Sequence, residues 1–238
     1  MQCRSIGVIE SPFKERFGIP RQAGLVVAAE ARLRLLPPFA SVDAVRGLSE
    51  FSHVWIIFRF ADSGLRDGQL MVRPPRLGGN ERLGVFATRS PFRPNSIGMS
   101  AVRLLAVDVT DGHVCLQLGG GDFLDGTEVL DIKPYVPYAD SIPFAQAGFA
   151  THPPSHVLAV EFSAAALASL AICAIEQPRL RELIAQSLQL DPRPAYQADG
   201  DSGRQYGVRL YDVDVKWVVV NSTATVIAIE KVSRKQLP

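Results

Sequence analysis

Short hydrophobic segments, alternating or continuous, fill the first half of the chain. Residues 31–35 read Ala-Arg-Leu-Arg-Leu, residues 51–60 form a nearly continuous apolar run, and Val- and Leu-rich segments follow at 100–109 and 114–118. Alternation with a period of two, and short β-branched runs between turn residues, are typical of strands. The region from 4 to about 133 is therefore predicted to consist of β-strands.

No helix of three turns is predicted between these strands. No segment before residue 134 holds an apolar stripe over three helical turns, so the strands do not alternate with helices in the βαβ manner. The glycines at 119–121 do not open a G-x-G-x-x-G motif, because position 124 is leucine, and the sequence contains no P-loop. These observations favour a single closed or nearly closed β-barrel over a doubly wound sheet.

A proline-rich stretch separates this region from a second one. Residues 134–154 contain five prolines, which prevent regular strand pairing. Beyond it, Ser163 is expected to cap a helix that runs through Glu176, and Pro178 is expected to open another helix with leucines at helical spacing. We therefore expect an arm or linker and then a second domain.

The second domain is predicted to be a small α+β unit. Its helices are followed by three segments with a period of two, near 206–212, 213–220 and 223–230, and Asn221-Ser222 is a plausible hairpin turn between the last two. The chain is thus expected to be mainly β, with a single N-terminal β-barrel domain at 1–142, an arm at 143–154 and a C-terminal α+β domain at 155–238.

Composition narrows the remaining classes of protein. With 238 residues, 47% of them hydrophobic, the chain is long enough for a real core, and a net charge of +1 excludes a globally basic coat protein for nucleic acid. Cys3, Cys115 and Cys173 are too far apart for a disulfide framework, which favours the cytoplasm. Neither an export signal nor a membrane span is expected. A metal site is not expected either, because two prolines stand between His152 and His156.

Charge is strongly segregated along the barrel region. Residues 73–103 hold six arginines and a single glutamate, whereas residues 104–142 hold seven acidic residues and one lysine. The planar guanidinium group suits phosphate and base recognition, and Phe86 and Phe92 lie among the arginines. The pattern indicates either a nucleic-acid surface or a structural network of ion pairs between neighbouring strands.

Two loops and an acidic turn are candidate ligand sites. The loops at 73–80 and 87–98 combine arginines with fixed prolines and glycines, and loops of this kind present backbone groups to ligands. The turn at 122–127, Asp-Phe-Leu-Asp-Gly-Thr, offers carboxylates and amides to a ribose or an amine. Taken alone, an ordinary Asp-Gly hairpin turn is the simpler interpretation of that turn.

Together these segments resemble the TsaA-like, or TrmO, family. The resemblance is dense over residues 4–142 and recurs at 191–196. The motifs that carry it are Ile6-Gly7-Val8-Ile9, Ser11-Pro12-Phe13-Lys14, Pro20-Arg21-Gln22, Phe51-Ser52-His53-Val54-Trp55, Arg73-Pro74-Pro75-Arg76, Gly84-Val85-Phe86-Ala87-Thr88-Arg89-Ser90-Pro91-Phe92-Arg93-Pro94-Asn95, Asp131-Ile132-Lys133-Pro134 and Asp191-Pro192-Arg193-Pro194-Ala195-Tyr196.

The resemblance implies a β-barrel methyltransferase that uses S-adenosylmethionine, differs from the Rossmann-type methyltransferases and works as a homodimer. It implies transfer of a methyl group to N6 of threonylcarbamoyladenosine beside the anticodon of certain threonine tRNAs. Two other classes stay open. One is a tRNA-binding module without catalysis. The other is a barrel enzyme, hydrolytic or S-adenosylmethionine-dependent, that acts on a small adenosine-containing molecule.

The resemblance also implies site residues at matching positions. The cofactor is expected against Gln22, Ala23, Gly24, Ala61, Asp62, Arg89, Leu124, Asp125, Gly126 and Thr127. The tRNA is expected against Arg73, Arg76 and Arg93 of the arginine-rich loops. It is also expected against the segment 191–196 with Arg193, so the C-terminal domain is expected to contact tRNA.

Methyl transfer needs the acceptor nitrogen in line with the methyl carbon, at about 3 Å, so positioning rather than a strong nucleophile is expected to dominate. Asp125, Asp131 or water is the candidate acceptor of the N6 proton. Arg76 and Arg93 are candidates to pair with the threonyl carboxylate.

Three positions depart from the family pattern. Ser96 and Glu128 stand where the family commonly has proline, and each change frees a φ angle that proline would fix. Ala61 is small where relatives often carry a larger polar residue, so a backbone contact is the one expected to transfer.

Overall fold

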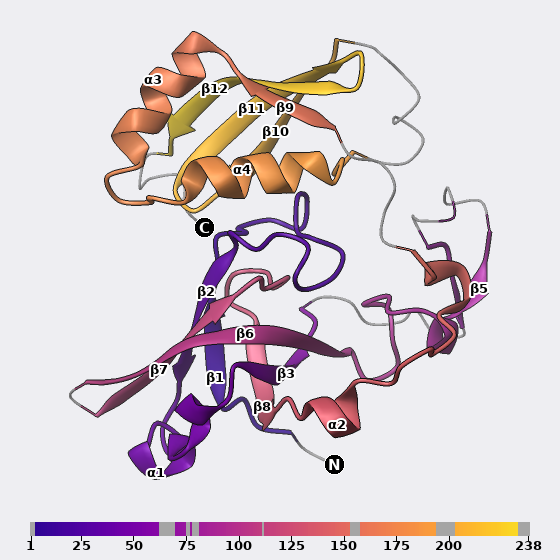
Figure 1. Ribbon diagram of the computed structural model, residues 1–238, viewed down its shortest axis with the longest axis vertical. Coiled ribbons are helices and arrows are strands. Elements are labelled where there is room, and N and C mark those ends of the chain that lie inside the picture. Colours follow the sequence, from indigo (N-terminus) through magenta and orange to yellow (C-terminus); the bar gives the residue numbers. More distant parts are fainter. Residues whose placement is uncertain are drawn as a thin grey trace.

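The computed structural model describes residues 3–61, 70–74, 77, 81–110, 112–152, 158–193 and 203–232. Six strands close into a barrel in the order β1-β2-β7-β6-β3-β8, and every neighbouring pair is antiparallel (Figure 1). The prediction of a single N-terminal barrel in a mainly β chain is confirmed. The strands are β1 (Gly7–Glu10), β2 (Glu30–Leu35), β3 (His53–Arg59), β6 (Ile97–Thr110), β7 (His113–Gly119) and β8 (Glu128–Pro134).

Alternation of side chains fills the barrel interior. In β2, Ala31, Leu33 and Leu35 are buried between exposed charged residues. The apolar run at 51–60 becomes one strand, β3, in which alternate residues point inward, while the outward Trp55 and Ile57 stay half-buried. A period of two therefore holds even where the sequence is apolar on both faces.

Short elements decorate the barrel. α1 (Val42–Val45) sends Val45 into the barrel core, and η1 (Leu48–Glu50) follows it. The connection from β3 to β6 carries the two-stranded unit β4 (Met71–Val72) and β5 (Leu83–Gly84), and then η3 (Val85–Ala87). After β8 the arm contains α2 (Pro137–Asp140) and η4 (Gly148–Ala150), and its residues 137–152 are all exposed.

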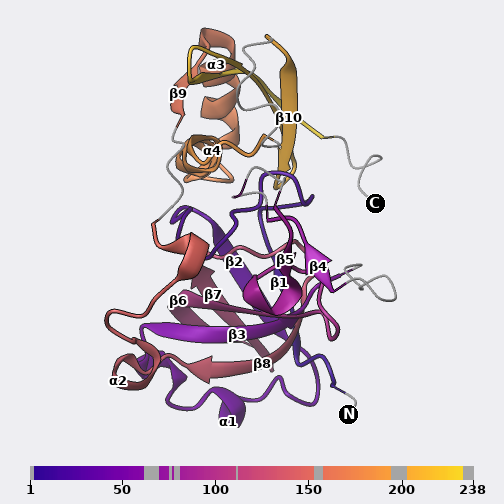
Figure 2. The same ribbon diagram turned by 90° about the vertical axis from the view of Figure 1, so that its right-hand side faces the viewer.

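The second domain is an α+β unit whose two helices cover one face of a four-stranded sheet (Figure 2). Ser163 caps the first helix as expected, by accepting from the Ala166 N–H, and Asn221 and Ser222 form the turn between the last two strands with φ angles of 47° and 58°. The sheet order is β10-β11-β12-β9, with β9 parallel to β12. The elements are β9 (Ala159–Phe162), α3 (Ala164–Cys173), α4 (Leu180–Gln189), β10 (Gln205–Leu210), β11 (Val213–Val220) and β12 (Thr223–Lys231).

The boundary between the two hydrophobic cores does not coincide with the arm at 143–154. The barrel core is built from barrel residues, but the core of the second sheet also contains Phe13, Val26, Ala28 and Ala29, which come from the segment between β1 and β2. This segment, residues 11–29, is called the wedge below. It lies between the barrel and the second domain (Figures 1 and 2). The wedge therefore belongs to the packing of both domains.

Candidate cofactor site and nucleic-acid surface

One rim of the barrel gathers the loops that carry the candidate cofactor residues. Because neighbouring strands are antiparallel, β1, β3 and β7 end at the same rim at which β2, β6 and β8 begin. Three connections lie there: the wedge, the β3–β6 connection and the loop 120–127. The candidate residues at 22–24, 61, 89 and 124–127 share this rim, whereas Asp62 lies outside the described residues.

Backbone contact joins two of these loops. The Gly24 N–H donates to the Gly120 carbonyl at 2.8 Å. Both glycines have positive φ, +82° and +73°, and a Cβ added to Gly120 would lie 3.4 Å from the Gly24 Cα. Glycine is the residue that adopts this backbone without strain. The two loops thus meet in a close backbone contact, called the cradle below, in which Gly24 is exposed and Gly120 is buried.

Arg89 connects the cradle to the arginine-rich loop. Its Nη1 donates to the Gln22 Oε1 at 2.6 Å, and the Arg89 side chain is exposed. In the same loop, the Arg93 Nη1 donates to the carbonyls of Val85, at 3.1 Å, and Thr88, at 2.7 Å. These bonds hold the irregular loop in one shape, so its exposed surface is preorganised.

Asp122 lies in the acidic turn that is a candidate ligand site, but it is not among the residues that the sequence predicts to bind the cofactor. The Ser100 hydroxyl donates to its Oδ1 at 2.7 Å. Burial raises the pKa of the Asp122 carboxyl; the Ser100 bond, backbone N–H groups including that of Ala23, and the charge of Arg89 oppose the increase. Asp122 thereby connects β6, the loop at 22–24 and the loop 120–127. The only sequence signal was its place in the acidic turn, because Ser100 lies 22 positions away.

The turn at 124–127 is not a β-hairpin. β7 pairs with β2 and β6, and β8 pairs with β1 and β3, so the loop joins strands that are not neighbours. Thr127 closes the turn, donating through its N–H and its hydroxyl to the Leu124 carbonyl at 3.2 and 2.6 Å. The ordinary hairpin interpretation of Asp125-Gly126 is therefore wrong.

The two candidate proton acceptors lie in different places. The Asp125 Oδ1 accepts from the Ser11 N–H at 2.8 Å, and its Oδ2 pairs with the Lys14 Nζ at 2.8 Å. Asp131 instead lines a cavity of about 660 Å³ beside α1, together with Ile6. Only Asp125 lies in a loop of the cradle rim, and its carboxylate already has two partners.

Among the candidate tRNA contacts, Arg73 is exposed just after β4, and Arg93 is half-buried. Arg76 and residues 194–196 lie outside the described residues. Arg193 is 5% exposed, and its Nε and Nη2 donate to Asp191 at 2.7 and 2.8 Å. A guanidinium buried in this way does not face a phosphate, so the expectation of direct tRNA contact by Arg193 is corrected to a structural role.

The arginine block is not an ion-pair network in the described part of the chain. There, the acidic residues Asp125, Glu128 and Asp131 pair with Lys14, Arg59 and Lys133, none of which belongs to the block. No ion pair joins a described arginine of 73–103 to a described acid of 104–142. The surface interpretation of these arginines is the one that the geometry favours.

Ser96 has a backbone that proline cannot adopt. Its φ is +48°, and its N–H donates to the Arg93 carbonyl at 3.3 Å. Proline fixes φ near −65° and has no N–H. The departure from the family pattern at this position therefore changes the local loop conformation.

The described residues contain neither a membrane-spanning helix nor a cluster of metal ligands. Within them, no helix is both long and apolar enough to cross a membrane. No group of three His, Cys, Asp or Glu residues in the same part of the chain is placed to hold a metal ion.

Comparison with known proteins decides the family. Residues 8–141 match the family model of the tRNA-methyltransferase O N-terminal domain, and residues 155–232 match that of the TrmO C-terminal domain. The chain belongs to the TrmO family. The resemblance indicated by the sequence motifs is thus confirmed, and both parts of the chain are accounted for.

Two bacterial relatives match this chain along most of their own length. A tRNA (adenine(37)-N6)-methyltransferase of Escherichia coli is 48% identical over 229 residues, which cover 96% of this chain and 97% of that protein. A Pseudomonas aeruginosa protein, named provisionally as the S-adenosylmethionine-dependent methyltransferase RcsF, is 52% identical over 89% of this chain and 90% of its own. A crystal structure of TrmO from Pseudomonas aeruginosa aligns with a TM-score of 0.79 at 42% identity, covering 97% of this chain and 98% of that one.

Proposed function

We propose that this chain is an S-adenosylmethionine-dependent tRNA methyltransferase that methylates N6 of the adenine at position 37, beside the anticodon. The observation that carries the proposal is the match to a tRNA (adenine(37)-N6)-methyltransferase over 96% of the chain. The acceptor we infer is threonylcarbamoyladenosine in threonine tRNA, as the sequence motifs imply. The arginine loops and the cradle supply an RNA side and a cofactor side on one rim.

The residues present at the rim fit the cofactor. When bound, S-adenosylmethionine supplies a methyl group on a positively charged sulfur. Gly24 leaves exposed backbone at the cradle, and Asp122 brings the carboxylate suited to a cationic group. Arg89 and Gln22 close the side that faces the arginine loop. We assign cofactor binding to these residues, to the backbone at Ala61 and to the turn 124–127.

The arginine loops would receive the tRNA. Arg73 and Arg89 are exposed, and Phe86, which is 75% exposed, lies 5.9 Å from the Arg93 guanidinium. Exposed aromatic rings beside guanidinium groups are typical of surfaces that stack single-stranded bases. We propose that Arg93 pairs with the threonyl carboxylate of the modified base and that Arg76 is the second candidate for this role.

Positioning would carry most of the catalysis. Asp125 is held by Ser11 and Lys14, and Asp131 lines the cavity beside α1, so neither carboxylate stands open on the cradle. We infer that water takes the N6 proton after transfer. Replacing Asp125 and Asp131 each by Asn, with kcat measured at saturating cofactor, tests this: full turnover in both variants supports water, and a loss of more than about a hundredfold in kcat for either contradicts it.

The arm is consistent with a dimer. Tyr138, Ile142 and Phe144 are 92%, 71% and 102% exposed in the single chain. Large apolar side chains gathered on one exposed segment are typical of surfaces that another protein covers. We propose that a second copy of the chain covers the arm and that the enzyme works in the cytoplasm, where its cysteines stay free thiols.

The test uses methyl-labelled S-adenosylmethionine with two pools of tRNA, one carrying threonylcarbamoyladenosine and one from cells unable to make it. Label at N6 of the modified base in the first pool alone supports the proposal. Arg93→Ala should lower the rate on modified tRNA and weaken the preference for it. Salt-steep RNA binding without cofactor retention would indicate a binding module, and turnover of a free nucleoside would indicate a small-molecule enzyme.

A further inference from the structure

Apolar side chains of the wedge complete the core of the second domain. Phe13, Val26, Ala28 and Ala29 are each at most 1% exposed. They lie in one cluster with Ile184 and other residues of α4 and the C-terminal sheet. Removing the second domain would leave these wedge residues uncovered, so the wedge takes its shape from both domains.

Backbone pairing extends this contact along β10. Phe13 forms an isolated antiparallel bridge with Leu210. The Tyr211 N–H donates to the Pro12 carbonyl at 2.7 Å, and the Arg209 N–H donates to the Glu15 Oε1 at 3.0 Å. The wedge thus adds a short strand-like edge to the C-terminal sheet.

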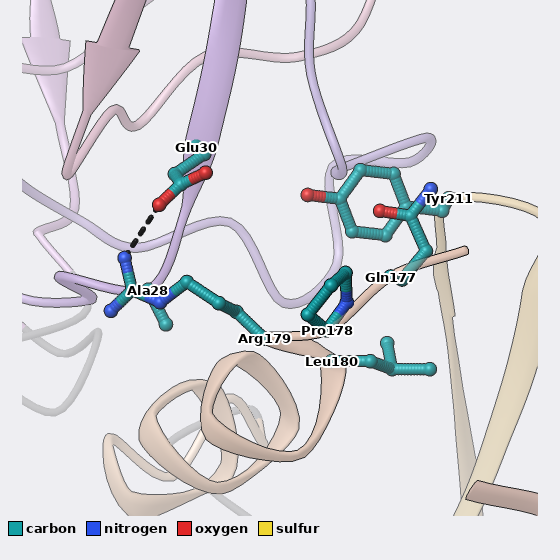
Figure 3. A pocket seen from close by; sticks show the side chains of 7 residues that line it. All are labelled: Ala28, Glu30, Gln177, Pro178, Arg179, Leu180 and Tyr211. Atoms are coloured by element: carbon teal, nitrogen blue, oxygen red, sulfur yellow. Dashed lines mark hydrogen bonds and ion pairs between the residues drawn. The ribbon is translucent and has the colours of Figure 1, made fainter. Parts of the chain in front are cut away.

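Two polar side chains of the α4 region hold the other end of the wedge. The Gln186 Oε1 accepts from the Ala28 N–H at 2.9 Å. Arg179 pairs with Glu30, the first residue of β2, at 2.6 Å (Figure 3). Between the domains this leaves a cavity of about 290 Å³ lined by Ala28, Glu30, Gln177, Pro178, Arg179, Leu180 and Tyr211 (Figure 3).

A continuous chain of hydrogen bonds leads from these contacts to the cradle. The Ala29 carbonyl accepts from Gly120 and Gly121 at 2.8 and 3.3 Å, and the Gly120 carbonyl accepts from Gly24 at 2.8 Å. At the other end of the wedge, the Phe13 carbonyl accepts from Asp125 at 2.9 Å. The loop 120–127 is therefore fastened near both of its ends to wedge residues that are buried in the core of the second domain, and the loop at 22–24 is joined to it through Gly120.

We propose that Gln186 and Arg179 of the C-terminal domain are positioning residues for the cofactor cradle: they fix Ala28 and Glu30, and through Ala29 they fix the loops at 22–24 and 119–121. The part of this inference that concerns the cofactor rests on the proposed function. The part that concerns the loop conformation rests on the hydrogen bonds alone. Neither side chain has to contact the cofactor: its removal would change cofactor binding through the conformation of the cradle loops.

The test compares three full-length variants. Gln186→Leu removes the acceptor of the Ala28 N–H, Gln186→Glu keeps an oxygen in its place, and Gln189→Leu makes the same chemical change on the exposed side of α4. Hydrogen exchange of the free protein should become faster at 22–24 and 119–121 in Gln186→Leu alone. The dissociation constant for S-adenosylmethionine, measured by calorimetry, should rise about 2- to 30-fold in that variant, with most of the affinity restored in Gln186→Glu.

The two readouts separate the two proposals. Unchanged exchange at the cradle loops in a folded Gln186→Leu would overturn the positioning role, and Arg179→Ala repeats that test at the second contact. Equally faster exchange at the cradle loops in Gln186→Leu and Gln189→Leu, or equal dissociation constants for S-adenosylmethionine in the two variants, would overturn it as well. Faster exchange in Gln186→Leu with no cofactor binding by the unaltered protein would leave the positioning role standing and overturn the proposed function.

Discussion

Phe13 offers a direct test of the shared core. The residue belongs to the barrel domain by sequence, yet its ring is 0% exposed in the cluster that includes Trp217 and Leu210. Replacing a buried phenylalanine by alanine costs about 3–5 kcal/mol, because the transfer energy is lost and a cavity remains. For a chain of this length, this corresponds to a fall in melting temperature of roughly 6 to 20 °C.

The chain carries its own probes for this measurement. Of its two tryptophans, Trp55 lies on β3 of the barrel and Trp217 lies on β11 in the second core. A background with Trp55→Phe therefore reports unfolding of the second domain by fluorescence. In that background Phe13→Ala should lower the midpoint by the amount given above.

A matched control is Ile9→Ala. Ile9 is also 0% exposed, but it belongs to the barrel core. In the complementary background, Trp217→Phe, this variant should lower the barrel transition that Trp55 reports. If Phe13→Ala moves only the Trp55 signal and leaves the Trp217 transition in place, the wedge is not part of the second core and the reasoning is refuted.

Three further substitutions have defined outcomes. Asp191→Ala should cost about 3–5 kcal/mol in urea unfolding, because it leaves Arg193 buried without its counter-charge, and adding Arg193→Met should recover most of that loss. Burial raises the pKa of Asp122 above its ordinary value of 3.8. The protonated carboxyl therefore favours the folded state fully below pH 3.8, and this stabilisation is lost as the pH rises through the raised pKa. As the pH rises through this window, the melting temperature of Asp122→Asn should therefore increase relative to that of the unaltered protein. The affinity of this variant for the cofactor should fall about 10- to 100-fold. A difference in melting temperature between the two proteins that does not change with pH would contradict the assignment. Ser96→Pro should cost about 1–3 kcal/mol, since it loses the φ of +48° and the N–H bond, and an unchanged melting temperature would show that the loop has another conformation.

Local patterns were sufficient for those strands and helices that a short window of sequence specifies, whereas α1, α2, β4 and β5 were not predicted. Alternation predicts β2, and the turn Asn221-Ser222 predicts the last hairpin. The first C-terminal helix is shorter than predicted: it ends at Cys173 rather than at Glu176. The N–H groups of Glu176 and Gln177 both turn back to the Cys173 carbonyl, and Pro178 disfavours a helical conformation at the residue before it.

The site was only partly accessible to sequence reasoning, because its key contacts join distant positions. Motifs indicated the loops at 22–24 and 124–127, and the topology places both on one rim. The role of Asp122 depends on Ser100, and the burial of Arg193 depends on a local pair with Asp191 inside a packed domain. Tertiary packing decides whether an arginine is exposed or buried, and the pattern of charges along the sequence carries no information about that packing.

The placement of the cradle follows from the closed barrel. A barrel of six strands is filled by its own side chains, so a ligand is bound at a rim rather than inside. One rim is beside α1, whose Val45 packs into the core, and the other carries the wedge. Rim loops are held only at their ends, and a methyl transfer that depends on alignment needs them held along their length. The second domain supplies that support through Phe13 and Ala29, so in this chain the second domain is a structural part of the proposed cofactor site as well as a candidate surface for tRNA.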